Sequence, residues 1–370
     1  MQPTPSQPRR RAATRRAATR PLAALVAAVA LVVAACGGST PTPSAATPSD
    51  APSIAASVTP SAAASPSAEP VALTVGLGYI PSVQFAQFYL AQQAGYYGDA
   101  GLAVTLQNKI DPDLITLLGQ GAVDIGSGDG TSVIPAVSQG IPIVYTATIY
   151  GQFPSVVIAK ADSGITTAAD LKGKKIGIPG KYGSSWIMLQ ALLQSASLTP
   201  ADVDIVEFPD FGQATALQQG TVDAATGFAN NEPIVLKNAG IDTTVLTVDD
   251  VVPLPGPGLV TGQQTLVAKE AALKAFTAAT LRAMDEIAAD PQVGLDATFA
   301  VVPDLAQDPA LQRQILDATV AQWTNPRTNA AFGTIDRDGW QQSLEFMTTL
   351  DLVPNPVTVD QLVNETLLPS

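Results

Sequence analysis

The sequence predicts an α/β protein built from two lobes. From residue 71 onward, short apolar runs that fit β-strands alternate with amphipathic segments that fit helices. The same alternation begins again at Lys175. The 300 residues of 71–370 are too many for one ordinary hydrophobic core and suit two. We therefore expect two α/β lobes, each with a mainly parallel sheet.

The expected elements follow one another in regular order. Strands are expected at 71–78, 103–106, 123–126 and 143–149, with helices between them at 83–94, 112–120 and 131–139. After the restart, strands are expected at 175–178, 203–208 and 222–227, and helices at 185–194 and 211–219. Beyond 258–261 the spacing becomes helical, at 269–289, 309–323 and 338–350. We expect the chain to cross between lobes near 156–160 and 257–261, so that 71–158 and 259–370 form one lobe and 159–258 the other.

Residues 1–35 predict a leader. The first 20 residues carry six arginines and no acidic residue, and a short apolar run follows at 22–35. This order is typical of a secretory signal, and the run is too short for a membrane-spanning helix. It ends in Val33-Ala34-Ala35-Cys36, which resembles the lipobox of bacterial lipoproteins, where the cysteine thiol accepts a diacylglycerol. We therefore expect a signal peptide at 1–35 and a lipid anchor at Cys36, against the alternative of a buried, inert cysteine.

Residues 36–70 predict a tether behind the anchored cysteine. The segment consists almost entirely of Ser, Thr, Pro, Ala and Gly. Such a composition cannot bury enough apolar surface to fold. As a flexible coil, it would reach on the order of 30 Å from a membrane.

The composition argues against most catalytic chemistry. The 370 residues contain no histidine and a single cysteine. Histidine is the commonest general base and metal ligand, so we expect no catalytic residue, no metal and no cofactor. Loss of the leader would remove six of 19 basic residues and none of 32 acidic ones, leaving a formal charge of −19. Nucleic acid is therefore not an expected partner.

Loops at the expected carboxyl ends of strands are the candidates for a ligand site, because ligands of open α/β sheets bind beyond those ends. In the first loop, 78–82, Tyr79 could stack on a ligand or cover a turn as an aromatic lid. The second loop, 126–131, is rich in glycine and includes Gly128 and Asp129. It could offer backbone N–H groups to a ligand, or form a tight turn with a helix cap. Its spacing fits neither a dinucleotide-binding motif nor a P-loop.

Two further loops belong to the second lobe. Loop 179–186 contributes Tyr182, Gly183, Ser184, Ser185 and Trp186. Aromatic residues make up only 5% of the chain, so two of them beside a helix N-terminus favour ligand contact over core packing.

Loop 227–233 contributes Asn230, Asn231 and Glu232, although helix capping before Pro233 explains the same pattern. Tyr150 and Gln152, just before the first crossing, are weaker candidates. Of the basic residues outside the leader, only Lys181 lies in one of the four loops. The sequence therefore predicts a small, flat, largely neutral ligand held between closing lobes.

Several motifs resemble those of the solute-binding proteins that include the sulfonate-binding and thiamine-pyrimidine-binding groups. They are Gly78-Tyr79-Ile80-Pro81, Phe85-Ala86-Gln87-Phe88-Tyr89-Leu90-Ala91, Asp170-Leu171-Lys172-Gly173-Lys174-Lys175-Ile176-Gly177 and Gly220-Thr221-Val222-Asp223-Ala224. More discriminating motifs are similar to the branch that binds thiamine-precursor pyrimidines or riboflavin. These are Asn231-Glu232-Pro233, Trp323-Thr324 and Asn364-Glu365-Thr366-Leu367-Leu368-Pro369. The resemblance spans essentially all of 71–370.

The resemblance implies a type II periplasmic-binding fold with a ligand cleft between two lobes. It also implies an extracytoplasmic receptor of an ABC importer that works with permease and ATPase subunits, and we expect the receptor to be a monomer. Related eukaryotic-type thiamine pyrimidine synthases consume an active-site histidine and carry a cysteine-rich motif, and this chain has neither.

Two alternatives stay open. An alkanesulfonate, taurine or nitrate-type anion could be held by helix N-termini, which need no basic side chain. A carboxylate-driven enzyme such as a glycosidase would need paired acids, and the loops offer only Asp129 and Glu232, one from each lobe.

Overall fold

The computed structural model describes residues 69–108, 113–249 and 251–369, which belong to one compact unit, 64–370. The predicted signal peptide, Cys36 and nearly all of the predicted tether lie outside the described residues. Within those residues, no helix is both long and apolar enough to cross a bilayer.

The first lobe is built on a five-stranded sheet with the strand order β2-β1-β3-β10-β4. Its strands are β1 (Val71–Gly76), β2 (Leu102–Gln107), β3 (Ile125–Gly128), β4 (Ile143–Thr148) and β10 (Gly258–Gly262). Strand β1 pairs in parallel with β2 and β3. Strand β10 is antiparallel to both of its neighbours, so the sheet is mixed although most strands run the same way.

The second lobe repeats this plan with the strand order β7-β6-β8-β5-β9. Its strands are β5 (Ser155–Lys160), β6 (Lys175–Ile178), β7 (Asp204–Glu207), β8 (Ala224–Phe228) and β9 (Thr243–Leu246). Strand β6 pairs in parallel with β7 and β8, whereas β5 is antiparallel to β8 and β9.

The reversed strand of each sheet is the one that follows a crossing between the lobes. A chain that leaves β4 at its carboxyl end enters the second sheet from the carboxyl edge of that sheet, so β5 must run against its neighbours. The same reasoning applies to β10 after β9. The lobe boundary expected between residues 158 and 159 therefore falls inside β5, which pairs only with strands of the second sheet. The chain crosses earlier, between β4 and β5. The second crossing, expected at 257–261, likewise falls largely inside β10, which pairs only with strands of the first sheet, so the chain crosses back between β9 and β10.

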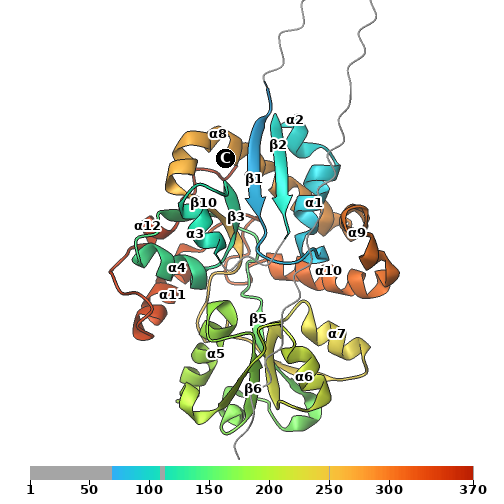
Figure 1. Cartoon of the computed structure of the whole chain (residues 1–370), viewed down its shortest axis with the longest axis vertical. Helices are drawn as coiled ribbons and strands as arrows, with labels where there is room; N and C mark the ends of the chain where they lie inside the picture. The colour runs from blue at the N-terminus through green and yellow to red at the C-terminus, as the bar shows by residue number, and fades with distance from the viewer. Residues whose placement is uncertain (1–68, 109–112, 250, 370) are drawn as a thin grey trace, which may run out of the picture. The chain divides into compact units, whose positions relative to one another are not determined.

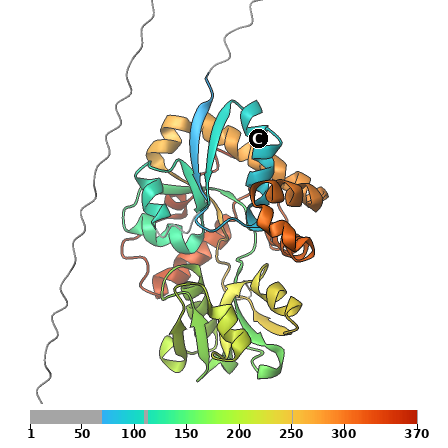
Figure 2. The ribbon, with the colours of Figure 1, turned by 45° about the vertical axis from the view of Figure 1, so that its right-hand side comes forward.

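Helices pack around both sheets (Figure 1). The first lobe carries α1 (Ala86–Gln93), α2 (Tyr96–Asp99), α3 (Leu114–Gly119), α4 (Gly130–Ser138), α8 (Gln263–Ala289), α9 (Pro291–Val301), α10 (Pro309–Trp323), α11 (Arg337–Thr349) and α12 (Val359–Leu362). The second lobe carries α5 (Gly183–Ser195), α6 (Gln213–Gln219) and α7 (Glu232–Asn238). Figure 2 shows that the C-terminal helices, in orange and red, stay with the first lobe.

Three apolar clusters form the core of the part of the chain that the structure describes. One fills the first lobe around α1, α8 and α10, where Tyr97 stacks on Phe276 with ring centroids 4.9 Å apart. A smaller one lies under α6 and α7 in the second lobe. The third contains Ile134 of α4 and Ile187 of α5, so it continues from one lobe into the other. The lobes are therefore joined by apolar packing as well as by the two crossings.

The starts of α6 and α8 differ from the expected residues by two and six positions. Helix α6 begins at Gln213 and not at 211, because Phe211 has a left-handed backbone with φ 61°. Helix α8 begins at Gln263, six residues before the expected start, and contains a break at Lys269. There the Lys269 ammonium pairs with Asp124 at 2.7 Å and donates to the Ala72 carbonyl at 3.1 Å, which ties the helix to the sheet.

Candidate functional site

A cavity of about 360 Å³ lies where the carboxyl ends of strands from both sheets meet. Its volume is within the range of small-molecule sites, and this edge of an α/β sheet is where ligands bind. The first lobe and the crossings line it with Leu77, Gly78, Tyr79, Gln84, Phe85, Leu114, Ile115, Ser127, Gly128, Asp129, Ser132, Tyr150 and Pro257. The second lobe contributes Pro179, Ser184, Ser185, Phe211, Gln213, Gly227, Phe228, Asn231 and Glu232. We call this cavity the cleft.

Tyr79 reaches the cleft from the turn that follows β1. Gly78 makes that turn possible with φ 72°, a left-handed conformation that favours glycine. The half-buried Tyr79 ring lies edge-on to the Phe211 ring of the other lobe, with centroids 5.9 Å apart and planes at 78°. Burial and the negative charge of Glu232 raise the pKa of Tyr79, so the phenol stays neutral. Tyr79 therefore presents an aromatic face and a neutral hydroxyl from the first lobe.

The glycine-rich loop after β3 serves packing and capping as well as lining the cleft. Asp129 Oδ1 accepts from the Ser132 N–H at 3.0 Å and caps α4, and it also accepts from the Thr131 hydroxyl at 2.7 Å. Burial raises the pKa of this carboxyl although those hydrogen bonds oppose the rise. At Gly130, an added Cβ would lie 2.6 Å from Pro255. The tight turn with a helix cap is thus present in the structure, and Gly128 and Asp129 also line the cleft.

Only some of the candidate residues in the loop before α5 reach the cleft. Ser184 and Ser185, in the first turn of α5, line the cleft. Tyr182 is 60% exposed, and its ring lies against Gly180. Trp186 is half-buried and packs on the apolar cluster shared by α4 and α5. Gly183 has φ 63°, which turns the chain into the helix. Of the five candidates in this loop, the structure brings the two serines to the cleft lining.

The loop after β8 likewise has some candidate residues that line the cleft and one that does not. Glu232 lines the cleft, and its Oε2 accepts the Phe228 N–H at 2.7 Å. Burial raises the pKa of Glu232 against the effect of that hydrogen bond. Asn231 also lines the cleft. Asn230 is fully buried beside it and donates from Nδ2 to the Thr319 hydroxyl of α10 at 2.8 Å, so it joins the two lobes.

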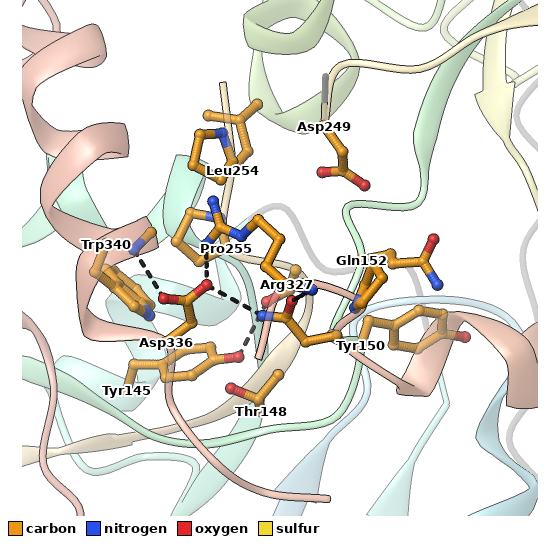
Figure 3. A pocket seen from close by; sticks show the side chains of 16 residues that line it. Tyr145, Thr148, Tyr150, Gln152, Asp249, Leu254, Pro255, Arg327, Asp336 and Trp340 are labelled. Carbon is orange, nitrogen blue, oxygen red and sulfur yellow. Dashed lines mark hydrogen bonds and ion pairs between the residues drawn. The ribbon is translucent and has the colours of Figure 1, made fainter. Parts of the chain in front are cut away.

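A second cavity of about 210 Å³ lies beside the crossings (Figure 3). Gln152 lines this cavity and not the cleft, because its Nε2 is held by the carbonyls of Ala321 and Thr324. Arg327 pairs with Asp336 across the same cavity. Tyr150 lines both cavities, and burial raises its pKa. Gln152 thus anchors the first crossing to the end of α10.

A family model described as NMT1/THI5 like matches residues 82–293, more than half of the chain. The chain belongs to the NMT1/THI5-like family. Asn231 and Glu232, which lie within the matched residues, line the cleft together with Tyr79 of the first lobe.

Proteins similar in sequence to this family member include two binding proteins and a synthase. The riboflavin-binding protein RibY of Chloroflexus aurantiacus is 32% identical over 347 residues, covering 92% of this chain and 95% of the relative. The formylaminopyrimidine-binding protein of Halalkalibacterium halodurans is 26% identical and covers 77% and 87% of the two chains. The 4-amino-5-hydroxymethyl-2-methylpyrimidine phosphate synthase of Legionella pneumophila is 23% identical and covers 80% and 92%.

Solved structures confirm the fold. The alkanesulfonate-binding protein SsuA of Xanthomonas axonopodis pv. citri, bound to MOPS, superposes with a TM-score of 0.64. It is 19% identical, and the match covers 80% of this chain and 99% of that one. The predicted type II periplasmic-binding fold, with two α/β lobes and a ligand cleft between them, is therefore present in this NMT1/THI5-like chain.

The cleft of this family member is lined by two carboxyl groups, those of Asp129 and Glu232. Among the described residues that line it, none is Lys or Arg, and both carboxyls have raised pKa values. No group of three or more His, Cys, Asp or Glu in the described residues is placed to hold a metal ion.

Sequence reasoning missed part of the cleft lining, above all Phe211 and Gln213. Both follow β7, whose carboxyl end faces the cleft. The signal that could have found them is an aromatic residue in a Pro-Asp-Phe-Gly turn at 209–212, directly after an expected strand.

Proposed function

We propose that this chain is the extracytoplasmic, lipid-anchored solute receptor of an ABC importer. Its ligand is a small aromatic heterocycle, either riboflavin or a thiamine-precursor pyrimidine. The receptor captures the heterocycle between the two lobes and delivers it to the permease and its ATPase.

The observation that carries this proposal is the chemistry of the cleft. Aromatic rings from both lobes, Tyr79 and Phe211, face one cavity whose other polar groups are hydroxyls, amides and two carboxyls with raised pKa. Rings supply stacking surface, and neutral polar groups orient a guest by hydrogen bonds. The names of the two binding-protein relatives, with riboflavin and a formylaminopyrimidine as ligands, support the same class.

An anion such as an alkanesulfonate is the second candidate, favoured by the likeness of the fold to SsuA. That likeness, at 19% identity, bears on the fold alone. The absence of Lys and Arg from the described cleft lining disfavours an anion, because no basic side chain there can pair with its charge. An enzyme that uses Asp129 and Glu232 as its pair is disfavoured too, since the Asp129 carboxyl caps α4 and the Glu232 carboxyl holds the Phe228 N–H.

A thermal-shift panel on the full chain tests the proposal. Riboflavin, 4-amino-5-hydroxymethyl-2-methylpyrimidine, taurine and nitrate are added separately. A ligand at a hundredfold excess over its Kd stabilises the folded state by about 2.7 kcal/mol, so a ring compound should raise the midpoint measurably. Tyr79→Ala should reduce that rise. Tyr96→Ala is the control, because the half-buried Tyr96 of α2 lies against Arg282 and does not line the cleft, so this variant should leave the ligand-induced rise unchanged. A rise with taurine or nitrate and none with either ring would overturn the proposal.

A further inference from the structure

The turn between β7 and α6 holds an aromatic residue in an unfavourable backbone conformation. Phe211 has φ 61°, in the left-handed region that bulky side chains seldom adopt. The turn is fixed by the Phe211 N–H donating to the Phe208 carbonyl at 2.9 Å and by the Gly212 N–H donating to Asp210 Oδ1 at 3.2 Å. Such strain persists where the surroundings hold it, and it gathers at ligand sites.

This strained turn places the Phe211 ring at the cleft. The ring is 36% exposed, lines the cavity and meets Tyr79 of the opposite lobe edge-on. An exposed aromatic ring in contact with the other lobe is free to exchange that contact for a planar guest, because edge-on and stacked arrangements of rings are both favourable.

Two residues further on, Gln213 carries a buried hydrogen-bond acceptor that has no partner among the described residues. The side chain is 3% exposed and lines the cleft. Its Nε2 donates to the Thr226 carbonyl at 3.2 Å. Because a carbonyl can only accept, this bond fixes which end of the amide faces Thr226 and leaves Oε1 for another donor. Oε1 is buried and has no hydrogen-bond partner within the described residues. Buried acceptors are nearly always paired, so an unpaired one beside a cavity calls for a donor.

We propose that the turn at 208–213 recognises the ligand. Phe211 stacks on the ring of the ligand, and Gln213 Oε1 accepts a hydrogen bond from an N–H group of the ligand. The ligand class is a planar heterocycle that carries a ring or exocyclic N–H, such as an imide, a lactam or an amino group. This inference rests on the proposed function and narrows it: a heterocycle without a donor at that edge leaves Oε1 unpaired and binds more weakly.

The test uses the full chain and pairs of probes that differ in one N–H. Riboflavin is compared with 3-methylriboflavin, which lacks the imide N–H. 4-Amino-2-methylpyrimidine is compared with its 4-dimethylamino analogue. Dissociation constants are measured by calorimetry. For the pair whose parent binds, the wild type should favour the N–H compound by about tenfold, the range of one neutral hydrogen bond. Gln213→Leu should bind both members of that pair alike.

The matched control for Gln213→Leu is Gln219→Leu, which makes the same substitution on the exposed end of the same helix. It should keep the tenfold preference. A general weakening by a misfolded helix would affect both members of a probe pair equally, so the preference separates recognition from a structural role.

Phe211→Gly tests the stacking half of the proposal. Glycine adopts a positive φ freely, so this variant should keep or raise the thermal midpoint while its affinity falls by about 5- to 100-fold, the range for one stacked ring. Val267→Ala, at an 83% exposed position on α8, is the control for loss of an exposed apolar side chain and should change neither quantity.

The outcomes separate two failures. If neither parent probe binds the wild type, the proposed function is wrong and the inference falls with it. If a parent binds but the Gln213→Leu preference and the Phe211→Gly affinity match the wild type, the proposed function stands and the role of the turn is overturned.

Discussion

Single residues in the cleft show how burial shifts a pKa. Glu232 has no basic residue beside it in the described cleft lining, and burial raises its pKa above the ordinary 4.5. The folded protein then holds the proton more tightly than the unfolded chain does. The stabilising contribution of that proton is complete below pH 4.5 and is lost as the pH rises through the folded-state pKa.

We expect Glu232→Gln to remove this dependence. The variant keeps an oxygen for the Phe228 N–H but carries no buried charge. Its thermal midpoint should lie about 1 to 3 °C above the wild type at pH 7 and match it near pH 4. Calorimetric scans between pH 4 and 8 measure the difference. An equal shift at every pH would show that the carboxyl does not titrate with folding.

Asp170 provides a control of opposite sign. Backbone N–H groups of Thr166 and Thr167 lower its pKa to about 2. Its charged form contributes stability that is present at neutral pH and lost as the pH falls through that pKa. Asp170→Asn should therefore lower the midpoint at pH 7, and its difference from the wild type should shrink as the pH approaches 2.

Close packing requires glycine at position 130 of the cleft loop. Gly130→Ala would bring a methyl group to 2.6 Å from the Pro255 ring, a clash that we expect to lower the free energy of unfolding by about 1 to 3 kcal/mol. Gly98→Ala, in α2 with no atom within 4 Å of the new Cβ, should raise it by about 0.4 to 1 kcal/mol. Urea denaturation measures both. A neutral Gly130→Ala would mean that the loop yields easily, which contradicts its tight contact with the second crossing.

Site residues were predictable as far as topology places loops at strand ends. Tyr79, Gly128, Asp129, Ser184, Ser185, Asn231 and Glu232 reach the cleft for that reason. Side-chain direction within a loop was not predictable. The Trp186 side chain packs on the core, and the Asn230 side chain donates a hydrogen bond to Thr319 of α10. Residues distant in the sequence determine both side-chain directions. Gln213 is the first residue of α6, and the helical spacing of that segment does not indicate that Gln213 lines a site.

At the scale of elements, α10 of the first lobe and the β8–α7 loop of the second meet at Asn230 and Thr319. The Thr319 hydroxyl accepts from Asn230 and donates to the Ile315 carbonyl at 2.8 Å within its own helix. Thr319→Val keeps the shape and removes the acceptor, which leaves the buried Asn230 amide short of a partner. We expect a loss of about 1 to 3 kcal/mol in the free energy of unfolding.

Thr298→Val is the matched control, because Thr298 is equally buried but donates only to Gly294 of its own helix at 2.8 Å. Chemical denaturation of both variants should show the larger loss for Thr319. Equal losses would show that the contact between the β8–α7 loop and α10 contributes no stability of its own.

Element boundaries followed the sequence where local signals were strong. Helix α10 spans 309–323 as expected, because Asp308 caps it, Pro309 opens it and its apolar spacing is regular. Strand β6 also matches at 175–178. The failures came from tertiary effects: β5 is a strand where a crossing was expected, and the ion pair of Lys269 with Asp124 sits at a break in α8 that spacing could not reveal.

At the scale of the whole molecule, the proposed lipid anchor would keep the proposed receptor beside its transporter. The anchor at Cys36 predicts that the wild-type chain, expressed in a bacterium that processes lipoproteins, is found in the membrane fraction. Cys36→Ser should move it to the soluble fraction or the medium, and mass spectrometry should show the loss of the diacylglycerol. A wild type without a lipid adduct would contradict the anchor while leaving the cleft untouched.

The central claim is that the cleft binds a neutral aromatic heterocycle. Calorimetric titration of the full chain with riboflavin, the aminopyrimidine and taurine, each at low and high salt, tests it most directly. We predict one-to-one binding of a ring compound with an affinity that salt leaves unchanged, because no basic residue lines the described cleft and a neutral ring forms no ion pair. Binding of taurine alone, weakened by salt, would contradict the claim.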